Sequence, residues 1–192
     1  KMSLIMRIIS GDFKGRKLSN INQFVSVKSL RPTLDRVRES CFNSIVHNNL
    51  LNFEGIKTLD LFAGTGSNGL ESLSRGSPFV TFIDNSLESL QIIKKNIHTL
   101  NINKRTQILK MDATNLGNNH FDFSFGLVFM DPPYDENLGI KAIKSAINGN
   151  WIKKGTIIVW EKKENLEIPE NFELKKSIVF KKMKIFILEY LK

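Results

Sequence analysis

The chain has 192 residues, of which 41% are hydrophobic and 24% charged, and its formal net charge is +9. This length suits one domain of ordinary size with a small extension, and no apolar run approaches the ~18 residues of a membrane-spanning helix. Cys41 is the single cysteine, which excludes an internal disulfide, and no secretion signal with a small-residue cleavage site is recognisable, so we expect a cytoplasmic protein.

The positive charge lies at the two ends of the sequence. Residues 1–40 contain nine Lys/Arg and three Asp/Glu, a net charge of +6, whereas residues 41–152 carry −1 and residues 153–192 carry +4. A basic segment beside a neutral core is typical of proteins with a polyanionic partner, most simply a nucleic acid. Ordinary solvated surface is the simpler interpretation of the C-terminal lysines. Arginines contribute to the N-terminal charge, so there we expect contact with a nucleic acid.

A small β-hairpin is predicted at the N-terminus, with strands near 4–10 and 16–21 and a turn at 11–15. Lys14, Arg16 and Lys17 lie at this turn, where they would contact phosphate groups. An exposed loop decorated only for solubility is the alternative. A second apolar run follows around 24–27. Met6 also suits an initiator, which leaves residues 1–5 as either an artificial extension or an upstream start.

A helix is expected to begin near Pro32, because proline is tolerated in a first helical turn. Apolar residues recur at helical spacing and mark one face: Leu34, Val37, Cys41 and Ile45. Arg31, Arg36 and Arg38 add three positive charges and are candidate RNA contacts. Arg38 falls inside the apolar stripe, so its guanidinium either reaches a cleft or pairs with an acid at the edge of the core.

Strands and helices alternate from residue 58 onward. Strands are predicted at 58–62, 79–83, 106–110, 125–130 and 156–161, helices at 68–75, 87–100 and 138–148, and a terminal hairpin at 172–180 and 184–191. This pattern indicates the α/β class: a Rossmann-like, mostly parallel sheet with an antiparallel C-terminal edge hairpin. We divide the chain into a β-hairpin extension, residues 1–30, which we expect to contact nucleic acid, and a main α/β domain, residues 31–192.

The first strand of this sheet leads into a glycine-rich turn. Gly64, Gly66 and Gly69 spell G-x-G-x-x-G at a helix start, and Asp84 follows Gly64 by 20 residues, which on paper satisfies a dinucleotide-binding fingerprint. Asp60 argues against a dinucleotide, because a carboxylate there is unfavourable beside a pyrophosphate. The same carboxylate suits an ammonium or a sulfonium group. S-adenosylmethionine carries both and has no phosphate.

Four consecutive strands end in an acid: Asp60, Asp84, Asp112 and Asp131. The carboxyl ends of parallel strands share one edge of the sheet, where ligands bind. Asp84 suits a pair of ribose hydroxyls and Asp112 an adenine amino group. The predicted cofactor set comprises these acids and their neighbours: Asp60, Phe62, Ala63, Gly64, Thr65, Gly66, Asp84, Asn85, Asp112 and Ala113.

Asp131, Pro132, Pro133 and Tyr134 follow the fourth strand and suit the binding of a planar amine. The carboxylate accepts a hydrogen bond from an N–H group, and the prolines present carbonyls on a fixed backbone. The tyrosine ring provides a face on which a base can stack. A polar turn after a strand is the alternative. The three histidines are scattered, so no metal site is expected.

Together these motifs resemble the RsmD type of bacterial 16S rRNA guanine-N2 methyltransferase, within the class I S-adenosylmethionine-dependent methyltransferases. The resemblance covers nearly the whole chain and rests on residues 7–11, 14–18, 30–33, 35–39, 60–66, 69–71, 73–76 and 131–134. It implies that the glycine loop and Asp84 hold S-adenosylmethionine and that residues 131–134 bind the target amine. It also implies that the N-terminal extension engages the small ribosomal subunit. Asp84 departs from the longer Glu usual in the family, and Asn68 from a small apolar residue.

The expected function is therefore transfer of a methyl group to the exocyclic N2 amine of a guanine in 16S rRNA, by a monomer. An adenine-N6 methyltransferase acting on DNA or RNA is an alternative, since Asp-Pro-Pro-Tyr also serves that amine. The absence of a large target-recognition domain counts against a DNA enzyme. A non-catalytic RNA-binding assembly factor is disfavoured by the intact motifs, and an NAD-dependent oxidoreductase by Asp60.

Overall fold

The computed structural model describes residues 6–19, 31–133, 136–163, 165–181 and 183–192, without the side chains of residues 31–34 and 136. Within these residues the helices and strands follow one another in this order: β1 (Met6–Arg7), β2 (Lys17–Leu18), α1 (Arg31–His47), β3 (Thr58–Leu61), α2 (Ser67–Ser74), β4 (Val80–Asp84), α3 (Leu87–Leu100), a 3-10 turn (Asn103–Arg105), β5 (Thr106–Lys110), β6 (Phe125–Met130), α4 (Glu136–Asn148), β7 (Ile152–Lys162), β8 (Phe172–Phe180) and β9 (Met183–Tyr190).

Seven of these strands form one sheet in the order β5-β4-β3-β6-β7-β9-β8. The five strands from β5 to β7 pair in parallel. Strand β9 runs antiparallel to both of its neighbours, β7 and β8. The order therefore reverses between β3 and β6, which is the position at which open α/β sheets bind ligands beyond the carboxyl ends of their strands.

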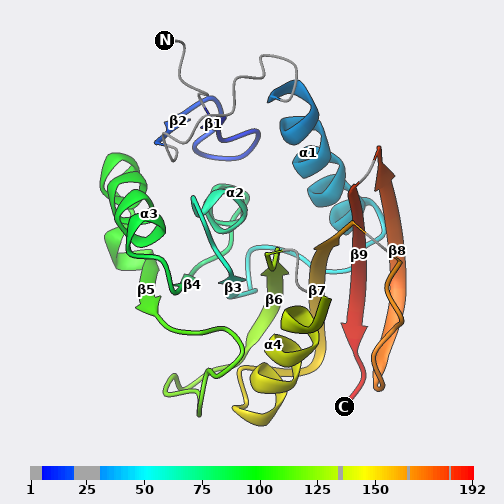
Figure 1. Cartoon of the computed structure of the whole chain (residues 1–192). Helices are drawn as coiled ribbons and strands as arrows, with labels where there is room; N and C mark the ends of the chain where they lie inside the picture. The colour runs from blue at the N-terminus through cyan, green and yellow to red at the C-terminus, as the bar shows by residue number, and fades with distance from the viewer. Residues whose placement is uncertain (1–5, 20–30, 134–135, 164, 182) are drawn as a thin grey trace.

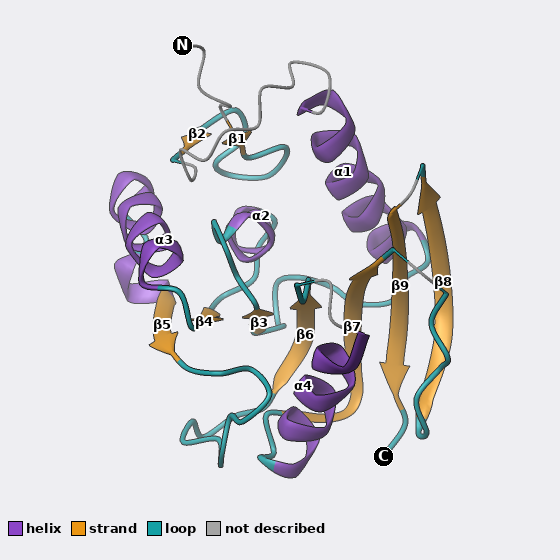
Figure 2. Cartoon of the chain, viewed as in Figure 1, coloured by secondary structure: helices purple, strands orange, loops and turns teal. Residues whose placement is uncertain are grey.

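Helices cover both faces of the sheet. Figures 1 and 2 show α1, α2 and α3 on one side and α4 on the other. The side chains of β6 alternate between these layers: Leu127 and Phe129 pack with α1, whereas Val128 and Met130 pack with α4. A strand covered on both faces is apolar throughout, and this explains the continuous apolar run of residues 125–130.

The hairpin formed by β1 and β2 is docked on α2 and α3 (Figure 1). Ile8 and Leu18 are buried in the same cluster as the apolar side chains of these helices. The turn of the hairpin lies over the end of α2, where the backbone N–H of Asp12 donates to the Ser74 carbonyl at 2.8 Å. Gly11 has φ +80°, and a Cβ at this position would overlap the Ser74 carbonyl. Glycine is therefore required for this close approach.

A buried carboxylate provides the second attachment of the hairpin. Glu71 of α2 is fully buried and accepts hydrogen bonds from the backbone N–H groups of Ile9 at 2.7 Å and Ser10 at 3.0 Å. Its third partner is the Nε of Arg75, at 2.8 Å. The Glu71 side chain thus satisfies two backbone donors from a segment about 60 residues earlier, and Arg75 compensates its negative charge.

Asn96 of α3 connects the hairpin to the glycine-rich turn. Its side chain accepts from the Ser19 backbone N–H at 2.7 Å and donates to the carbonyls of Ser19 and Thr65, both at 3.2 Å. The hydroxyl of Thr65 also donates to the Met6 sulfur at 3.4 Å. The extension is therefore joined directly to the loop predicted to hold the cofactor.

The predicted α/β class, the Rossmann-like sheet and the N-terminal hairpin are confirmed. The predicted bounds of α3, β5 and β6 agree with the structure. Strand β7 begins at Ile152, earlier than predicted, with a register shift against β6 between Phe125 and Leu127. The C-terminal hairpin places β9 inside the sheet, so β8 forms the edge and runs in the same direction as β7. The apolar run near 24–27 lies outside the described residues.

Candidate active site

The predicted acids lie at the carboxyl ends of adjacent strands. Asp60 is in β3, Asp84 ends β4, and Asp112 and Asp131 follow β5 and β6. The negative charges of Asp131 and Asp84 both raise the pKa of Asp60, which shows that these three carboxyl groups lie within electrostatic range of one another. The structure thus brings together acids separated by up to 71 positions in the sequence.

The glycine-rich turn adopts a conformation that requires several positive φ angles. Phe62, Gly64 and Gly66 have φ values of 57°, 55° and 76°. Phe62 was not expected to adopt this left-handed conformation, which is uncommon for a bulky residue and is found at functional sites. Gly69 lies against Phe82, where a Cβ would overlap the aromatic ring. The turn is therefore tied both to the sheet and to the start of α2.

The turn leaves space where a cofactor would lie. A Cβ added to Gly64 would approach only the Phe62 carbonyl oxygen, at 3.9 Å, so this glycine faces open space. Asp84 holds the turn from below: its carboxylate accepts from the backbone N–H groups of Gly64 and Ser86, both at 2.8 Å. Each carboxylate oxygen accepts one of these two bonds and keeps a lone pair for a ribose hydroxyl. The geometry therefore fits the group that the sequence predicted. Asn85, beside Asp84, is exposed.

Asp60 is held by the protein and is not open to solvent. Its side chain is buried and accepts from the Gly69 backbone N–H at 2.9 Å. Burial, with smaller contributions from the charges of Asp131 and Asp84, raises its pKa to about 8 despite the opposing Gly69 hydrogen bond. A cation bound nearby would lower this pKa again. Asp60 thus supports the start of α2, and it would provide negative potential to the site when a bound cation favours its ionised form.

We predict that Asp60 makes the ligand-free protein less stable as the pH rises. Its pKa in the folded state, about 8, lies above its ordinary value of 3.8, so the folded state binds the proton more tightly. The contribution to stability is complete below about pH 4 and is lost as the pH rises towards 8. Asp60→Asn cannot ionise, so the melting temperature of this variant should fall less than that of the wild type between pH 5 and pH 8. Parallel melting curves for the two proteins across that range would contradict the prediction.

Asp112 closes a turn after β5. One oxygen of its carboxylate accepts from both the backbone N–H and the hydroxyl of Thr114, at 2.8 Å each. The residue is exposed, and its second oxygen is not used by these bonds, which agrees with a contact to an amino group. Ala113 is buried.

Asp131, Pro132 and Pro133 follow β6 at the same edge, whereas Tyr134 lies outside the described residues. Asp131 is open to solvent, yet the surrounding protein reduces its hydration enough to raise its pKa to about 6. Pro132 is half-buried and Pro133 is exposed. The pKa of this carboxyl group therefore lies close to neutral pH. The group can accept a proton or a hydrogen bond from a ligand.

Glu161 is an acid at this edge that the sequence analysis did not select. It lies near the end of β7 and is half-buried, and burial together with the charge of Asp131 raises its pKa to about 8. The signal was present, because the fifth predicted strand also ends in an acid.

The predicted basic residues lie in different environments. Lys14, Arg16 and Lys17 are exposed on the hairpin, and the Arg31 side chain is not among those described. Arg38 is 9% exposed, and its Nη2 donates to the Arg7 carbonyl at 2.8 Å and to Asp35 at 3.0 Å. Burial lowers its pKa against the opposing charges of Glu71 and Asp35. Of the two alternatives, the paired arginine is the one found: Arg38 links α1 to β1.

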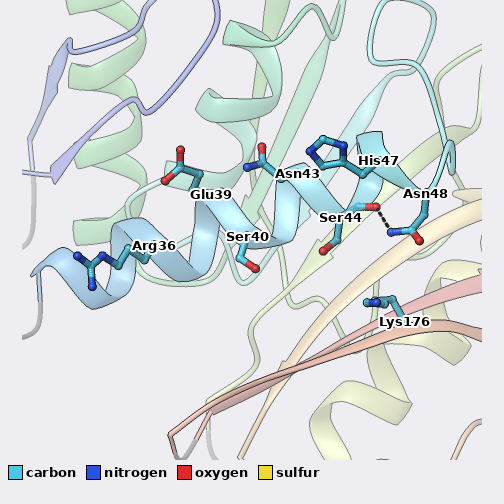
Figure 3. Close-up of a pocket in the computed structure, with 8 residues that line it drawn as sticks. All are labelled: Arg36, Glu39, Ser40, Asn43, Ser44, His47, Asn48 and Lys176. Carbon is cyan, nitrogen blue, oxygen red and sulfur yellow. Dashed lines mark hydrogen bonds between the residues drawn. The ribbon is translucent and has the colours of Figure 1, made fainter.

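Arg36 lines a polar groove of about 480 Å³ between α1 and β8 (Figure 3). Lys176 of β8 faces it, and the side chains between them are mostly hydroxyls and amides: Ser40, Asn43, Ser44 and Asn48. The hydrogen bond from Asn48 to the Ser44 carbonyl, at 2.7 Å, closes the helix end beside the groove. Arg36 is thus exposed at the groove, whereas Arg38 of the same helix is buried.

In the described part of the chain, no three His, Cys, Asp or Glu side chains are placed so that they could hold a metal ion. None of the helices described is long and apolar enough to cross a membrane.

Known proteins resemble the chain along nearly its full length. Residues 6–189 match the family described as "Conserved hypothetical protein 95". The chain is 38% identical over 168 residues to YlbH of Bacillus subtilis, covering 86% of each chain. It is 35% identical over 183 residues to the ribosomal RNA small subunit methyltransferase D of Haemophilus influenzae, covering 90% of this chain and 87% of that one. A solved structure from Haemophilus influenzae superimposes with a TM-score of 0.78 at 30% identity and covers 98% of this chain and 99% of that one.

Proposed function

Since this chain belongs to the Conserved hypothetical protein 95 family, the RsmD-type class I S-adenosylmethionine-dependent methyltransferases, we propose that it methylates the exocyclic N2 amine of a guanine in 16S rRNA. The single observation that carries the proposal is the convergence of Asp60, Asp84 and Asp131 around an open glycine turn at one sheet edge. The name of the Haemophilus influenzae relative supports ribosomal RNA of the small subunit as the substrate.

The cofactor part of the proposal assigns a task to each side chain around the turn. Asp84 binds the ribose hydroxyls, Asp112 the adenine amino group, and the open face of Gly64 admits the chain that bears the transferable methyl group. S-adenosylmethionine supplies that methyl group on an already electrophilic sulfonium. The protein therefore needs only to align the acceptor amine in line with the methyl group, at about 3–3.5 Å.

The acceptor part assigns the amine to Asp131 and the Pro132 carbonyl. The lone pair of a guanine amine is delocalised into the ring, and two acceptors holding its two N–H groups favour a pyramidal nitrogen. As the new C–N bond forms, the nitrogen becomes cationic and these acceptors bind it more strongly, which stabilises the transition state selectively. One N–H proton then leaves to Asp131 or to water. Tyr134 would stack on the base taken out of its surroundings.

The proposed RNA-engaging element is the hairpin extension within residues 1–30. Its docking on α2 and α3 means that this extension is packed onto the catalytic domain, residues 31–192, and shares its core through Ile8 and Leu18. Its basic residues Lys14, Arg16 and Lys17 remain exposed on the outside. The hairpin is thus suited to hold RNA at a fixed position relative to the cofactor loop.

We predict that replacing Lys14, Arg16 and Lys17 together with serine weakens RNA binding and flattens its salt dependence. Each lost phosphate contact should lower the salt slope by up to ~0.9. The melting temperature should barely change, because these side chains are exposed. The measurement is RNA affinity at several salt concentrations. The matched control replaces Lys141, Lys144 and Lys154, three exposed lysines elsewhere on the surface; equal effects of the two triple variants would show that only the total charge matters.

The proposed function is tested by labelling. The protein and S-adenosylmethionine with a labelled methyl group are incubated with undermethylated small subunits, and the modified nucleoside is then identified. N2-methylguanosine is the expected product. N6-methyladenosine would instead establish the alternative amine, and stable RNA binding with no methylation of subunits or free rRNA would indicate a non-catalytic assembly factor.

A further inference from the structure

Glu161 lies beside Asp131 because of the register of the sheet. Strands β6 and β7 are parallel, and Met130 is the partner of Trp160, so Asp131 and Glu161 occupy the next row. Phe129 and Val159, two residues earlier in each strand, both pack in the cluster under α1. Side chains alternate along a strand, so Asp131, just beyond the end of β6, and Glu161 in β7 are expected on the same side of two neighbouring backbones, whose usual spacing is about 4.8 Å.

Among the described residues, Glu161 forms neither a hydrogen bond nor an ion pair, although it is half-buried. Glu71, the fully buried acid of α2, has three donors by comparison. The charge of Glu161 also reaches inward to α1, where burial and this charge raise the pKa of the Cys41 thiol to about 12. The carboxylate oxygens of this half-buried acid are therefore available to accept a hydrogen bond from a ligand.

The chemistry of the two amines proposed as acceptors differs at the neighbouring ring atom. In guanine the amine N2 lies next to N1–H, so two adjacent positions donate hydrogen bonds. In adenine the amine N6 lies next to a bare N1, which carries a lone pair. Two carboxyl groups side by side therefore match guanine, whereas an ionised Glu161 would face the lone pair of adenine.

We propose that Glu161 accepts a hydrogen bond from the N1–H of the target guanine while Asp131 accepts one from its N2 amine, so that Glu161 selects guanine over adenine. This inference rests on the proposed function and adds the residue that sets its base specificity. The N–H donor and the nearby cationic cofactor both favour the ionised form of Glu161 in the complex. In the free protein, burial and, to a smaller extent, the charge of Asp131 oppose that form and raise the pKa of Glu161.

The test compares guanine with an analogue that lacks the feature Glu161 is proposed to bind. RNA with guanine at the methylated position is compared with RNA carrying 2-aminopurine there, which keeps the N2 amine but lacks both N1–H and the O6 carbonyl, so the Glu161 variants are needed to isolate the contribution of N1–H. The wild type should prefer guanine in kcat/KM by about 10- to 100-fold, the usual strength of a hydrogen bond to a charged group. In Glu161→Leu the part of this preference that comes from N1–H should be lost, so the preference should fall by about 10-fold or more, whereas Glu161→Gln keeps an acceptor oxygen and should retain part of it.

The ratio of kcat/KM for the guanine RNA to that for the 2-aminopurine RNA distinguishes a loss of base recognition from a general structural defect. A structural defect would lower both kcat/KM values together. A preference for guanine that is unchanged in both Glu161→Leu and Glu161→Gln overturns the inference and leaves the proposed function standing. If the wild type methylates adenine in place of guanine, or neither base, the proposed function fails and the inference fails with it.

Discussion

Replacing Glu71 with alanine should lower the free energy of unfolding by about 3–5 kcal/mol, the usual effect of removing one partner of a buried ion pair. The substitution leaves the backbone N–H groups of Ile9 and Ser10 without their acceptor, and Arg75 without its counter-ion. It also removes a negative charge that helps to keep the buried Arg38 protonated. Chemical denaturation followed by circular dichroism measures the loss.

Two control variants test whether the loss of stability comes from the buried hydrogen bonds of Glu71. Glu167 is an exposed acid, and Glu167→Ala should change the free energy of unfolding by less than about 0.5 kcal/mol. Glu71→Gln keeps an oxygen that can accept one of the two backbone bonds, so its loss should lie between those of the other two variants. The role assigned to Glu71 is wrong if Glu71→Ala unfolds at the same denaturant concentration as Glu167→Ala.

Replacing Asp131 with alanine should lower kcat by about 100- to 1,000-fold, comparable to removing one preorganised group that stabilises developing charge in a transition state. Asp131 faces the acceptor, so its hydrogen bond to the amine strengthens as the nitrogen becomes cationic. The affinity for S-adenosylmethionine should change little, because the turn at Gly64 and the carboxylate of Asp84 remain in place. Single-turnover methylation of RNA and calorimetric titration of S-adenosylmethionine measure the two quantities.

Asp84→Ala should affect cofactor affinity, in contrast to Asp131→Ala. It should weaken binding of S-adenosylmethionine by about 1.5–3 kcal/mol, through loss of charge-assisted hydrogen bonds, and should also leave the Gly64 backbone N–H without its acceptor. Methylation by Asp131→Ala at the wild-type rate would remove Asp131 from the acceptor site. Tight cofactor binding by Asp84→Ala would remove Asp84 from the cofactor site.

Local patterns in the sequence were sufficient to predict the central sheet. The run 125–130 and the periodic residues of α3 fix the type of each element through their own spacing, and acids at strand ends fall at one edge in any parallel sheet. Asp60, Asp84 and Asp131 could therefore be placed near one another before any coordinates were considered.

Contacts between distant segments could not be predicted in this way. The pairing of Glu71 with Ile9 and Ser10 joins residues about 60 positions apart, and nothing in the spacing of either segment indicates it. Arg38 is similar: its position on the apolar face was recognised, but its partner, the Arg7 carbonyl, depends on where the hairpin docks. That Glu161 lacks a hydrogen-bond or ion-pair partner among the described residues likewise depends on the surroundings of β7 and not on the strand itself.

The docking of the hairpin on the end of α2 has a consequence for the order in which the chain folds. The hydrogen bonds that attach residues 9–19 reach 61 to 77 positions along the sequence. During synthesis these residues emerge long before Ser74 and Asn96, so their backbone donors remain hydrated until α2 and α3 exist. Long-range contacts of this kind form late, because closing a long loop costs entropy before any contact compensates it. The first described segment of the chain is therefore among the last to reach its final position, and the cofactor loop acquires its Asn96 bridge to Ser19 only at that stage.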